Sequence, residues 1–448
     1  MFLLPLIYFS LLSYYLYKRQ EGFTVAVYIS ALYAITALCA VFTILNGYMG
    51  EDGGILFDNN NAEFGVVPTL LYCALLTATI WPFTRFNTTK IKHTELTNPL
   101  VLDIFGVGMI LMLVLNIYLV ADSTLDILNG DFAELRHSVY EGEESPAKLK
   151  AMSMPVIYYI YLFNAVTIFA LPLAFYNITH HRCAWWFNGL LLLTSLSKPI
   201  AAVQTADRTE IAFWGIMAAL TLVMFWREIT LKVKITLVAA SAPFIAAMAI
   251  YLSAVTTDRF DKSYAGPAAA AMQYVGQGYI NFCYFWENAK SDFISTEREF
   301  PLCNRMLTGT VSDSDRRNVR SAEHGFFISV FPTFIGDVLL DLTLPGLILW
   351  LLVYIAICYR FIPNTEDLDT TIHAADYLVV FMLGIVPSFG IFYYRFFDFQ
   401  STIIILGVAI VTFISKHTFS LSDAEDEEPD SLPCELPDQS DRTETIHS

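Results

Sequence analysis

Arg208 offers the most distinctive chemistry in the chain. It lies in a short polar turn from Thr205 to Glu210, between two apolar stretches that are each long enough to cross a bilayer. A guanidinium presents planar, bidentate donors and stays charged, so an arginine held at a membrane surface suits a phosphate or diphosphate. The same side chain could instead reach water and pair with Asp207 or Glu210, and residue type alone leaves both interpretations open.

Other basic residues on the same side of the predicted membrane extend this hypothesis. Lys198 lies inside a neighbouring span, where an ionisable side chain usually faces an interior cavity, although it could also extend to the nearby surface. Arginines in two long polar loops could form a cationic funnel for an anionic substrate, or be neutralised there by acidic neighbours. The predicted diphosphate-binding residues are Arg208, Arg136, Lys198, Arg298, Arg305 and Arg320.

Candidates for a general base precede the ninth predicted span. Asp337 and Asp341 straddle its beginning, and His324 lies a short way upstream. A carboxylate or imidazole beside a bound diphosphate could take a proton from a substrate hydroxyl. The aspartates could equally cap the N-terminal end of the helix, where negative charge is favoured, and this remains the simpler interpretation of the pair.

These side chains depend on an apolar framework. The chain of 448 residues is 55% hydrophobic and only 15% charged, with a mean hydropathy of +0.51. Its apolar residues form continuous blocks near the ~20 residues that cross a bilayer as a helix, whereas barrels show short alternating segments. We therefore predict an all-α polytopic integral membrane protein with about eleven transmembrane helices. The expected spans are near 2–17, 23–47, 64–84, 99–121, 153–177, 185–204, 210–226, 235–256, 339–359, 375–394 and 399–415.

The distribution of Lys and Arg orients the chain. Alternate short connections are basic, and such connections remain in the cytoplasm, whereas the connections between them are poorer in Lys and Arg. This pattern places the N-terminus outside and the C-terminal residues inside. The basic connections contain Lys18 and Arg19; Arg85, Lys90 and Lys92; Arg182; Arg227, Lys232 and Lys234; Arg360; and Lys416.

Residues 1–416 make up the predicted transmembrane domain, with long outer loops at 122–152 and 257–338, the larger one before the ninth span. The stretch 324–340 is apolar enough to dip into the membrane. Residues 417–448 form a cytoplasmic tail, whose ten acidic residues and single arginine are typical of disorder and account for much of the net charge of −17.

The sequence also limits the other classes of site. No Cys-x-x-Cys or His-rich motif predicts a metal, no glycine-rich fingerprint predicts a nucleotide cofactor, and no basic region predicts nucleic-acid binding. Cys283 and Cys303 share the larger outer loop. They could form a disulfide there or remain independent free thiols.

Together these features resemble the bacterial O-antigen polymerases (Wzy-type), the oligosaccharide repeat-unit polymerase family. The resemblance rests on many helices with one large outer loop late in the chain, on the turn that contains Arg208, and on the segment from Phe334 to Gly346. The stretch from Gly130 to Arg136 is also similar. The resemblance covers the architecture of nearly the whole chain to about residue 416. One departure is the turn before Arg208, where the family usually has a glycine.

The resemblance implies a glycosyltransferase in the bacterial cytoplasmic (inner) membrane, active at its periplasmic face. It would transfer a growing glycan from undecaprenyl diphosphate to a new lipid-linked repeat unit, with Arg208, Asp337 and His324 as catalytic candidates and no metal or cofactor. Its partners would be lipid-linked oligosaccharides, a chain-length regulator and a flippase. The alternatives are an O-antigen ligase, which uses the same donor, and a flippase or transporter of lipid-linked oligosaccharide, which the lack of an internal repeat disfavours.

The orientation can be tested with reporter fusions. We expect Asn87 and Ser420 to report from the cytoplasm, and Glu143 and Asp313 to report from outside, because the basic connections stay inside. Paired alkaline phosphatase and green fluorescent protein fusions at each site measure this. An outward signal at Ser420 would contradict an odd number of spans that starts outside.

Overall fold

The computed structural model describes residues 1–49, 55–57, 64–91, 94–96, 98–120, 152–204, 208–236, 239, 266–289, 296–309, 314–367, 371–393 and 398–416. Helices dominate this part of the chain, and its strands are a two-residue parallel pair, β1 (Thr94–Glu95) and β2 (Ile372–His373). The predicted all-α class is confirmed for these residues. The predicted loop 122–152, with Arg136, and the predicted tail 417–448 lie outside them.

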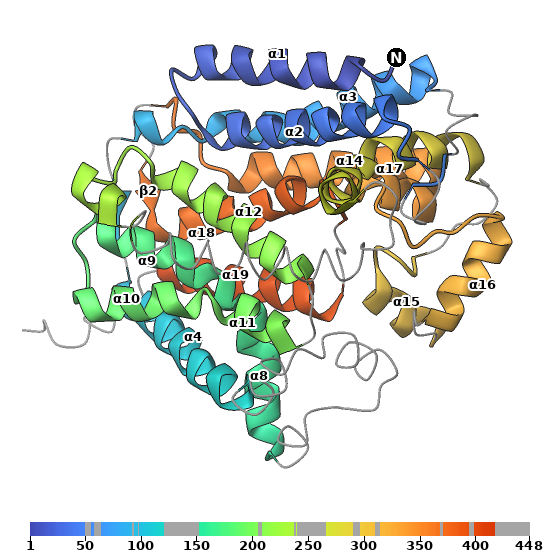
Figure 1. Cartoon of the computed structure of the whole chain (residues 1–448). Helices are drawn as coiled ribbons and strands as arrows, with labels where there is room; N and C mark the ends of the chain where they lie inside the picture. Colours follow the sequence, from blue (N-terminus) through green and yellow to red (C-terminus); the bar gives the residue numbers. More distant parts are fainter. Residues whose placement is uncertain are drawn as a thin grey trace, which may run out of the picture.

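Most helices run in alternate directions along one bundle (Figure 1). The first half of the chain contributes α1 (Leu4–Arg19), α2 (Val25–Leu45), α3 (Val66–Ile80), η1 (Trp81–Arg85), η2 (Thr88–Lys90) and α4 (Pro99–Val120). The central part contributes α8 (Met154–Val166), η3 (Thr167–Phe169), α9 (Ala170–Thr179), α10 (Trp185–Thr194), α11 (Ser197–Gln204) and α12 (Arg208–Phe225). The last part contributes α14 (Gly266–Asn288), α15 (Pro301–Thr308), α16 (Ser314–His324), α17 (Thr333–Phe361), α18 (Ala374–Phe389) and α19 (Phe399–Lys416).

Five helical segments of the described chain are long and apolar enough to cross a membrane. They are Val25–Leu45, Val66–Lys90, Pro99–Leu119, Met154–Thr179 and Thr333–Phe361. Shorter apolar helices occupy Thr209–Phe225, Ala374–Phe389 and Gln400–Lys416. Large apolar side chains such as Leu349 and Leu352 are 65% and 60% exposed on α17, as expected where a helix faces lipid. These features fit a multi-pass membrane protein, and the number of about eleven spans stays a prediction.

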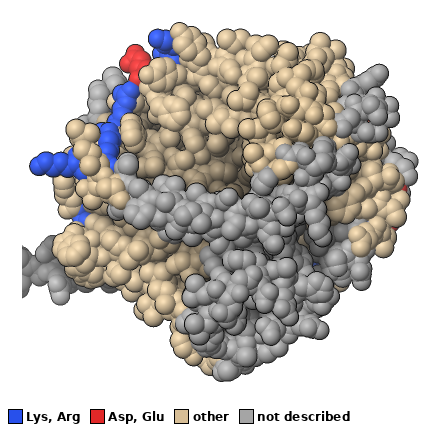
Figure 2. Space-filling view, viewed as in Figure 1, with Lys and Arg blue, Asp and Glu red and all other residues tan. Residues whose placement is uncertain are grey.

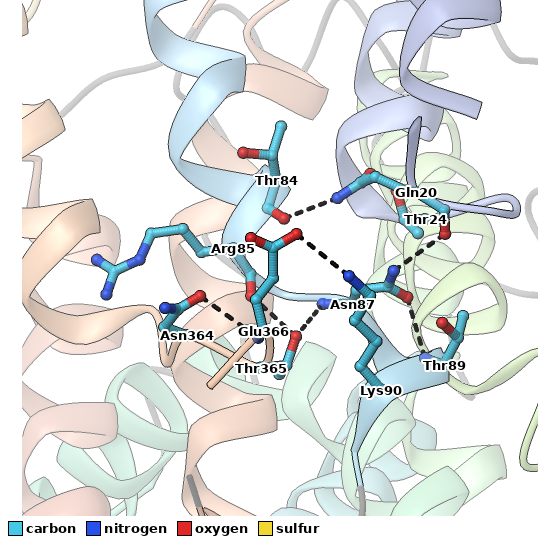
Figure 3. Close-up of polar contacts among 10 residues, drawn as sticks. All are labelled: Gln20, Thr24, Thr84, Arg85, Asn87, Thr89, Lys90, Asn364, Thr365 and Glu366. Carbon is cyan, nitrogen blue, oxygen red and sulfur yellow. Dashed lines mark hydrogen bonds and ion pairs between the residues drawn. The ribbon is translucent and has the colours of Figure 1, made fainter. Parts of the chain in front are cut away.

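Polar contacts join the connections after α1, α3 and α17 at one end of the bundle (Figure 3). Gln20 donates from its amide to the backbone oxygen of Thr84 at 2.7 Å, and Asn87 donates to the backbone oxygen of Gln20 at 3.0 Å. Thr365, beyond α17, accepts from the backbone N–H of Asn87 at 2.8 Å and donates its own N–H to Arg85. Buried backbone groups of three separate loops are thereby satisfied.

The remaining basic connections meet at the same end. β1 pairs with β2 just before α18, and Lys416, at the end of α19, lies 2.5 Å from the carboxylate of Asp376 in the first turn of α18. Arg182 pairs with Asp103 in α4 at 2.8 Å. We call this the basic end of the bundle. In Figure 2 the Lys and Arg side chains of the visible face gather at the left edge, over the ends of α1 and α12, with an acidic side chain beside them.

The other end is built around α14, which lies inside the predicted outer loop 257–338. Its side chains Tyr279 and Phe282 are almost completely buried, so this part of the predicted polar loop is instead an element of the core. Two glycines allow the close packing. A Cβ on Gly276 would lie 2.5 Å from the backbone nitrogen of Ala40 in α2, and one on Gly278 would lie 2.9 Å from a backbone oxygen.

Two further expectations change at this end. The ninth span begins at Thr333 rather than near 339, and the residues from Gly325 to Pro332 approach it without helical structure, so the proposed membrane dip is the start of α17. Cys283 and Cys303 are both free thiols. Cys283 is fully buried in α14 among core residues, whereas Cys303 is partly buried in α15.

Glu228, just beyond α12, gives the basic end a pH-sensitive group. Its carboxylate accepts from the Tyr377 hydroxyl at 3.0 Å, and burial raises its pKa from 4.5 to about 6, although this hydrogen bond acts in the opposite direction. The folded protein therefore binds more protons than the unfolded chain between these two pKa values. The free energy of unfolding should fall as the pH rises through this window, by at most about 2 kcal/mol.

We expect Glu228→Gln to remove this component of the pH dependence. The measurement is unfolding of the detergent-solubilised protein by circular dichroism across about pH 4.5 to 7. Glu366→Gln is the matched control, because Glu366 is exposed at the same end and should leave the profile unchanged. A Glu228→Gln profile that keeps the full wild-type slope would exclude Glu228 as its source.

Candidate functional site

The beginning of α17 forms a short half-helix that is set apart from the rest of the element. Thr343 adopts φ 60° and ψ −179°, and Pro345 follows it, so the helical path breaks between the half-helix Thr333–Leu342 and the apolar remainder. Proline removes a backbone donor and its ring collides with the preceding turn, which explains a break at this position. Asp337 and Asp341 lie four residues apart on the half-helix and therefore share one face.

Asp341 is fully buried and joins three separate groups. One carboxylate oxygen accepts the backbone N–H groups of Arg298 at 3.0 Å and Glu299 at 2.8 Å. The other oxygen pairs with the guanidinium of Arg320, on α16, at 3.1 Å. The predicted cap at the N-terminal end of this helix is therefore wrong for Asp341, which accepts backbone N–H groups of the segment before α15 and none at the beginning of α17.

Arg298 makes the second ion pair of the half-helix. Its Nε lies 2.5 Å from the carboxylate of Asp337, whose side chain is 1% exposed. Its two terminal nitrogens donate to the backbone oxygens of Ile328 and Val330. The arginine therefore fastens the non-helical approach to α17 onto the half-helix, with its donors directed at protein acceptors.

His324 closes the cluster at the last residue of α16. Its Nε2 lies 3.4 Å from a guanidinium nitrogen of Arg320, and its side chain is 4% exposed. Because the guanidinium can only donate, Nε2 is the accepting nitrogen and the proton of the neutral ring is assigned to Nδ1. The α17 cluster thus comprises Arg298, Arg320, His324, Asp337 and Asp341.

A second charged pair lies between α11 and α12. Lys198, which is 4% exposed, places its Nζ 3.4 Å from a carboxylate oxygen of Glu210 and 4.9 Å from the ring centre of Phe213. The aromatic face and the carboxylate together stabilise the buried cation. Lys198 therefore faces the protein interior, which is the first of its two predicted environments.

Aromatic rings connect this pair to the α17 cluster. Phe213 packs edge-on against Phe389 at 4.9 Å, and Phe389 lies 5.5 Å from Tyr393, beyond α18. Tyr393 stacks on Phe331 at 5.4 Å, immediately before the half-helix. The backbone N–H of Phe334 then donates to Gly390 at 3.0 Å. A continuous series of packed aromatic rings therefore connects the Lys198–Glu210 pair of α11 and α12 to the beginning of α17.

The predicted site residues have different environments. Arg208 is the first residue of α12, and its side chain, like Arg136, lies outside the described part of the structure. Arg305 is exposed on α15. Arg298 and Arg320 are directed at Asp337 and Asp341, so their role as diphosphate ligands stays a prediction.

Glu210 is a partner of Lys198 that residue type did not single out. In the sequence Glu210, like Asp207, is only an alternative partner of Arg208, whereas the structure pairs it with Lys198 on the preceding helix. Lys198 precedes Gln204, at the end of α11, by as many residues as Glu210 follows it. Residues placed in this way on two helices joined by a short turn can face each other, and this spacing could have predicted the pair. Within the described residues, no group of three His, Cys, Asp or Glu side chains could hold a metal ion.

No family model, no curated protein and no solved structure matches this chain. The resemblance carried by the Arg208 turn and by the beginning of the ninth span therefore remains a prediction from the sequence.

The energetic role of Asp341 can be measured directly. Asp341→Ala should lower the free energy of unfolding by about 3–5 kcal/mol, because it leaves the buried Arg320 guanidinium and two backbone N–H groups without their acceptor. Lys90→Ala is the control, since the Lys90–Glu366 pair is 41% and 52% exposed and should contribute no more than about 1 kcal/mol. Detergent-based unfolding that finds equal stability in both variants would refute this role.

Proposed function

We propose that this protein polymerises undecaprenyl-diphosphate-linked oligosaccharide repeat units at the outer face of the bacterial cytoplasmic membrane, using about eleven transmembrane helices. The observation that carries the proposal is the separation of charge along the bundle. Alternate basic connections meet at one end, whereas Lys198, Glu210 and the α17 cluster lie toward the other. Under the positive-inside rule, the basic end is cytoplasmic and the candidate site faces outward.

The substrates suit this arrangement. Donor and acceptor each have a polyprenyl tail that belongs in the bilayer and a diphosphate that belongs at its surface. Arg208 begins α12, an 18-residue helix whose N-terminal end carries partial positive charge. Arg208, this helix end and Lys198 on the adjoining α11 would place cations where the diphosphate of the donor must lie.

The site must stabilise the negative charge of the departing lipid diphosphate. Negative charge develops on the leaving oxygen as the glycosidic bond breaks, and a nearby arginine stabilises it in the transition state. A base must also accept the proton of the attacking sugar hydroxyl. His324 and Asp337 are the two candidates, and His324 would have to release its Nε2 contact with Arg320 before this nitrogen could take the proton.

The α17 cluster would act mainly by positioning. Two ion pairs and two backbone hydrogen bonds fix the segment before α15 and the end of α16 onto the half-helix. This arrangement would hold the helix α15, with its exposed Arg305, in a fixed position relative to the half-helix.

The central test is Arg208→Ala in a strain that lacks the native gene. We expect polymer lengthening to be lost while the protein level and membrane insertion stay unchanged. A lost charge-assisted contact costs roughly 1.5–3 kcal/mol per hydrogen bond, and loss of one transition-state donor costs about 100- to 1000-fold in rate. Arg208→Lys should restore only part of the activity, because it keeps the charge but not the planar fork. Glycan chain length on gels is the measurement.

Arg360→Ala is the matched control, because Arg360 is an exposed cation at the basic end and should support a normal ladder. A normal ladder from Arg208→Ala would remove Arg208 from the site and move attention to Arg136 and Arg305. Loss of attachment of chains of every length to lipid A-core, with polymer still forming, would instead identify a ligase.

A further inference from the structure

The segment after α12 carries basic and apolar side chains on an exposed edge of the basic end. Residues 231–236 are helical, and Leu231 and Ile235 are 71% and 61% exposed. Trp226, at the start of the segment, is 47% exposed. Tryptophan and exposed aliphatic side chains in such a position are typical of the boundary between lipid and water.

Basic groups surround this apolar edge. Lys234 places its Nζ 4.5 Å from the ring centre of Trp226, and Lys232 is exposed on the same short helix. Arg227, next to the tryptophan, is exposed and donates to the backbone oxygen of Glu21 at the end of α1. This contact brings Arg227 beside the connection that contains the exposed Lys18 and Arg19, which are the basic residues of α1.

The acidic groups nearby do not neutralise the edge. Glu228 points inward to the hydroxyl of Tyr377, so Glu21 is the exposed acidic residue among the basic residues described above. Lys90, by contrast, is at the same end but has an acidic partner in Glu366 at 3.3 Å. Positive charge therefore accumulates specifically between the ends of α1 and α12, where Figure 2 shows Lys and Arg side chains at the left edge.

We propose that Arg227, Lys232 and Lys234, with Trp226, bind the phosphate of an anionic phospholipid headgroup. The lysines and the arginine provide charged donors, and the indole lies at the depth of the glycerol backbone. Leu231 and Ile235 contact the upper part of the acyl chains. The combination of donors and exposed aliphatic side chains selects a lipid phosphate over a soluble anion, which would gain nothing from the apolar half of the site.

This site is independent of the proposed polymerase activity, because it lies at the other end of the bundle from the candidate active site. It would anchor the end of α12 in the inner leaflet. Since α12 begins at Arg208, a fixed inner end also limits how far its outer end can tilt.

The test is native mass spectrometry of the full-length protein in detergent, titrated with phosphatidylglycerol or with neutral phosphatidylcholine. We expect the wild type to retain phosphatidylglycerol selectively. The double variant Lys232→Gln/Lys234→Gln should bind it roughly 30-fold more weakly, since each basic residue near an anionic surface contributes about 1 kcal/mol and each 1.4 kcal/mol is a factor of ten. Lys90→Gln, which removes a paired cation from the same end, should bind like the wild type.

Three outcomes would overturn the proposal. The double variant could retain phosphatidylglycerol as well as the wild type, or phosphatidylcholine could bind as tightly as phosphatidylglycerol. Displacement of phosphatidylglycerol by inorganic phosphate alone would show a site for a free anion instead. Glycan chain length measured on the same variants separates this proposal from the polymerase, because a normal ladder with lost lipid retention supports the lipid site and leaves the active site unaffected.

Discussion

The organisation of the end opposite the basic end depends on one buried carboxylate. Asp341 accepts two backbone N–H groups and one guanidinium, so a segment before α15, the helix α16 and the half-helix of α17 all meet at a single side chain. A charge in this position is stable only with its partners in place, because a buried ion without compensation costs several kcal/mol. Asp337, one turn earlier, likewise pairs with a basic residue, Arg298. Arg298 also binds the backbone of the loop before α17 and so fixes this loop to the half-helix. Polar segments that could not fold alone are thereby held against an apolar bundle.

At the basic end, the connections between helices are short and are joined by contacts that are individually weaker. There, loops are joined by neutral hydrogen bonds such as those of Gln20 and Asn87 (Figure 3). A minimal parallel pair of strands and the Lys416–Asp376 ion pair add to them. Short connections need few contacts because the helices already fix their ends. Long connections cannot rely on this, which explains why buried ion pairs concentrate at the opposite end. The distribution of contacts therefore follows loop length as well as charge.

The sequence predicted the framework well and the polar contacts poorly. Within the described residues, apolar blocks coincide with most of the long helices, and alternating Lys and Arg grouped connections that the structure brings together, because both signals depend on local composition. The predicted span 235–256 lies almost entirely outside these residues. The burial of α14 was missed because its tyrosines, asparagine and glutamine lower its hydropathy, while the packing that buries them depends on Gly276 and Gly278 meeting distant backbone. Likewise, the predicted cap at Asp341 was wrong because its backbone donors are more than forty residues away in sequence. Pairings such as Lys198 with Glu210 follow from the shape of a hairpin, which composition does not encode.

The break at Thr343 also has a consequence for how the chain enters the membrane during synthesis. An aspartate at the centre of a transmembrane helix disfavours insertion by about 2.5–3.5 kcal/mol, and an uninterrupted α17 would bring two of them toward the bilayer. Because the path breaks before Pro345, the stretch from Leu344 to Phe361 can span about 27 Å by itself, with Arg360, near its basic end, as its only charged residue. The translocation machinery thus meets an apolar segment that inserts readily. Asp337 and Asp341 belong to the half-helix before the break, so insertion of the apolar stretch does not depend on their ion pairs with Arg298 and Arg320.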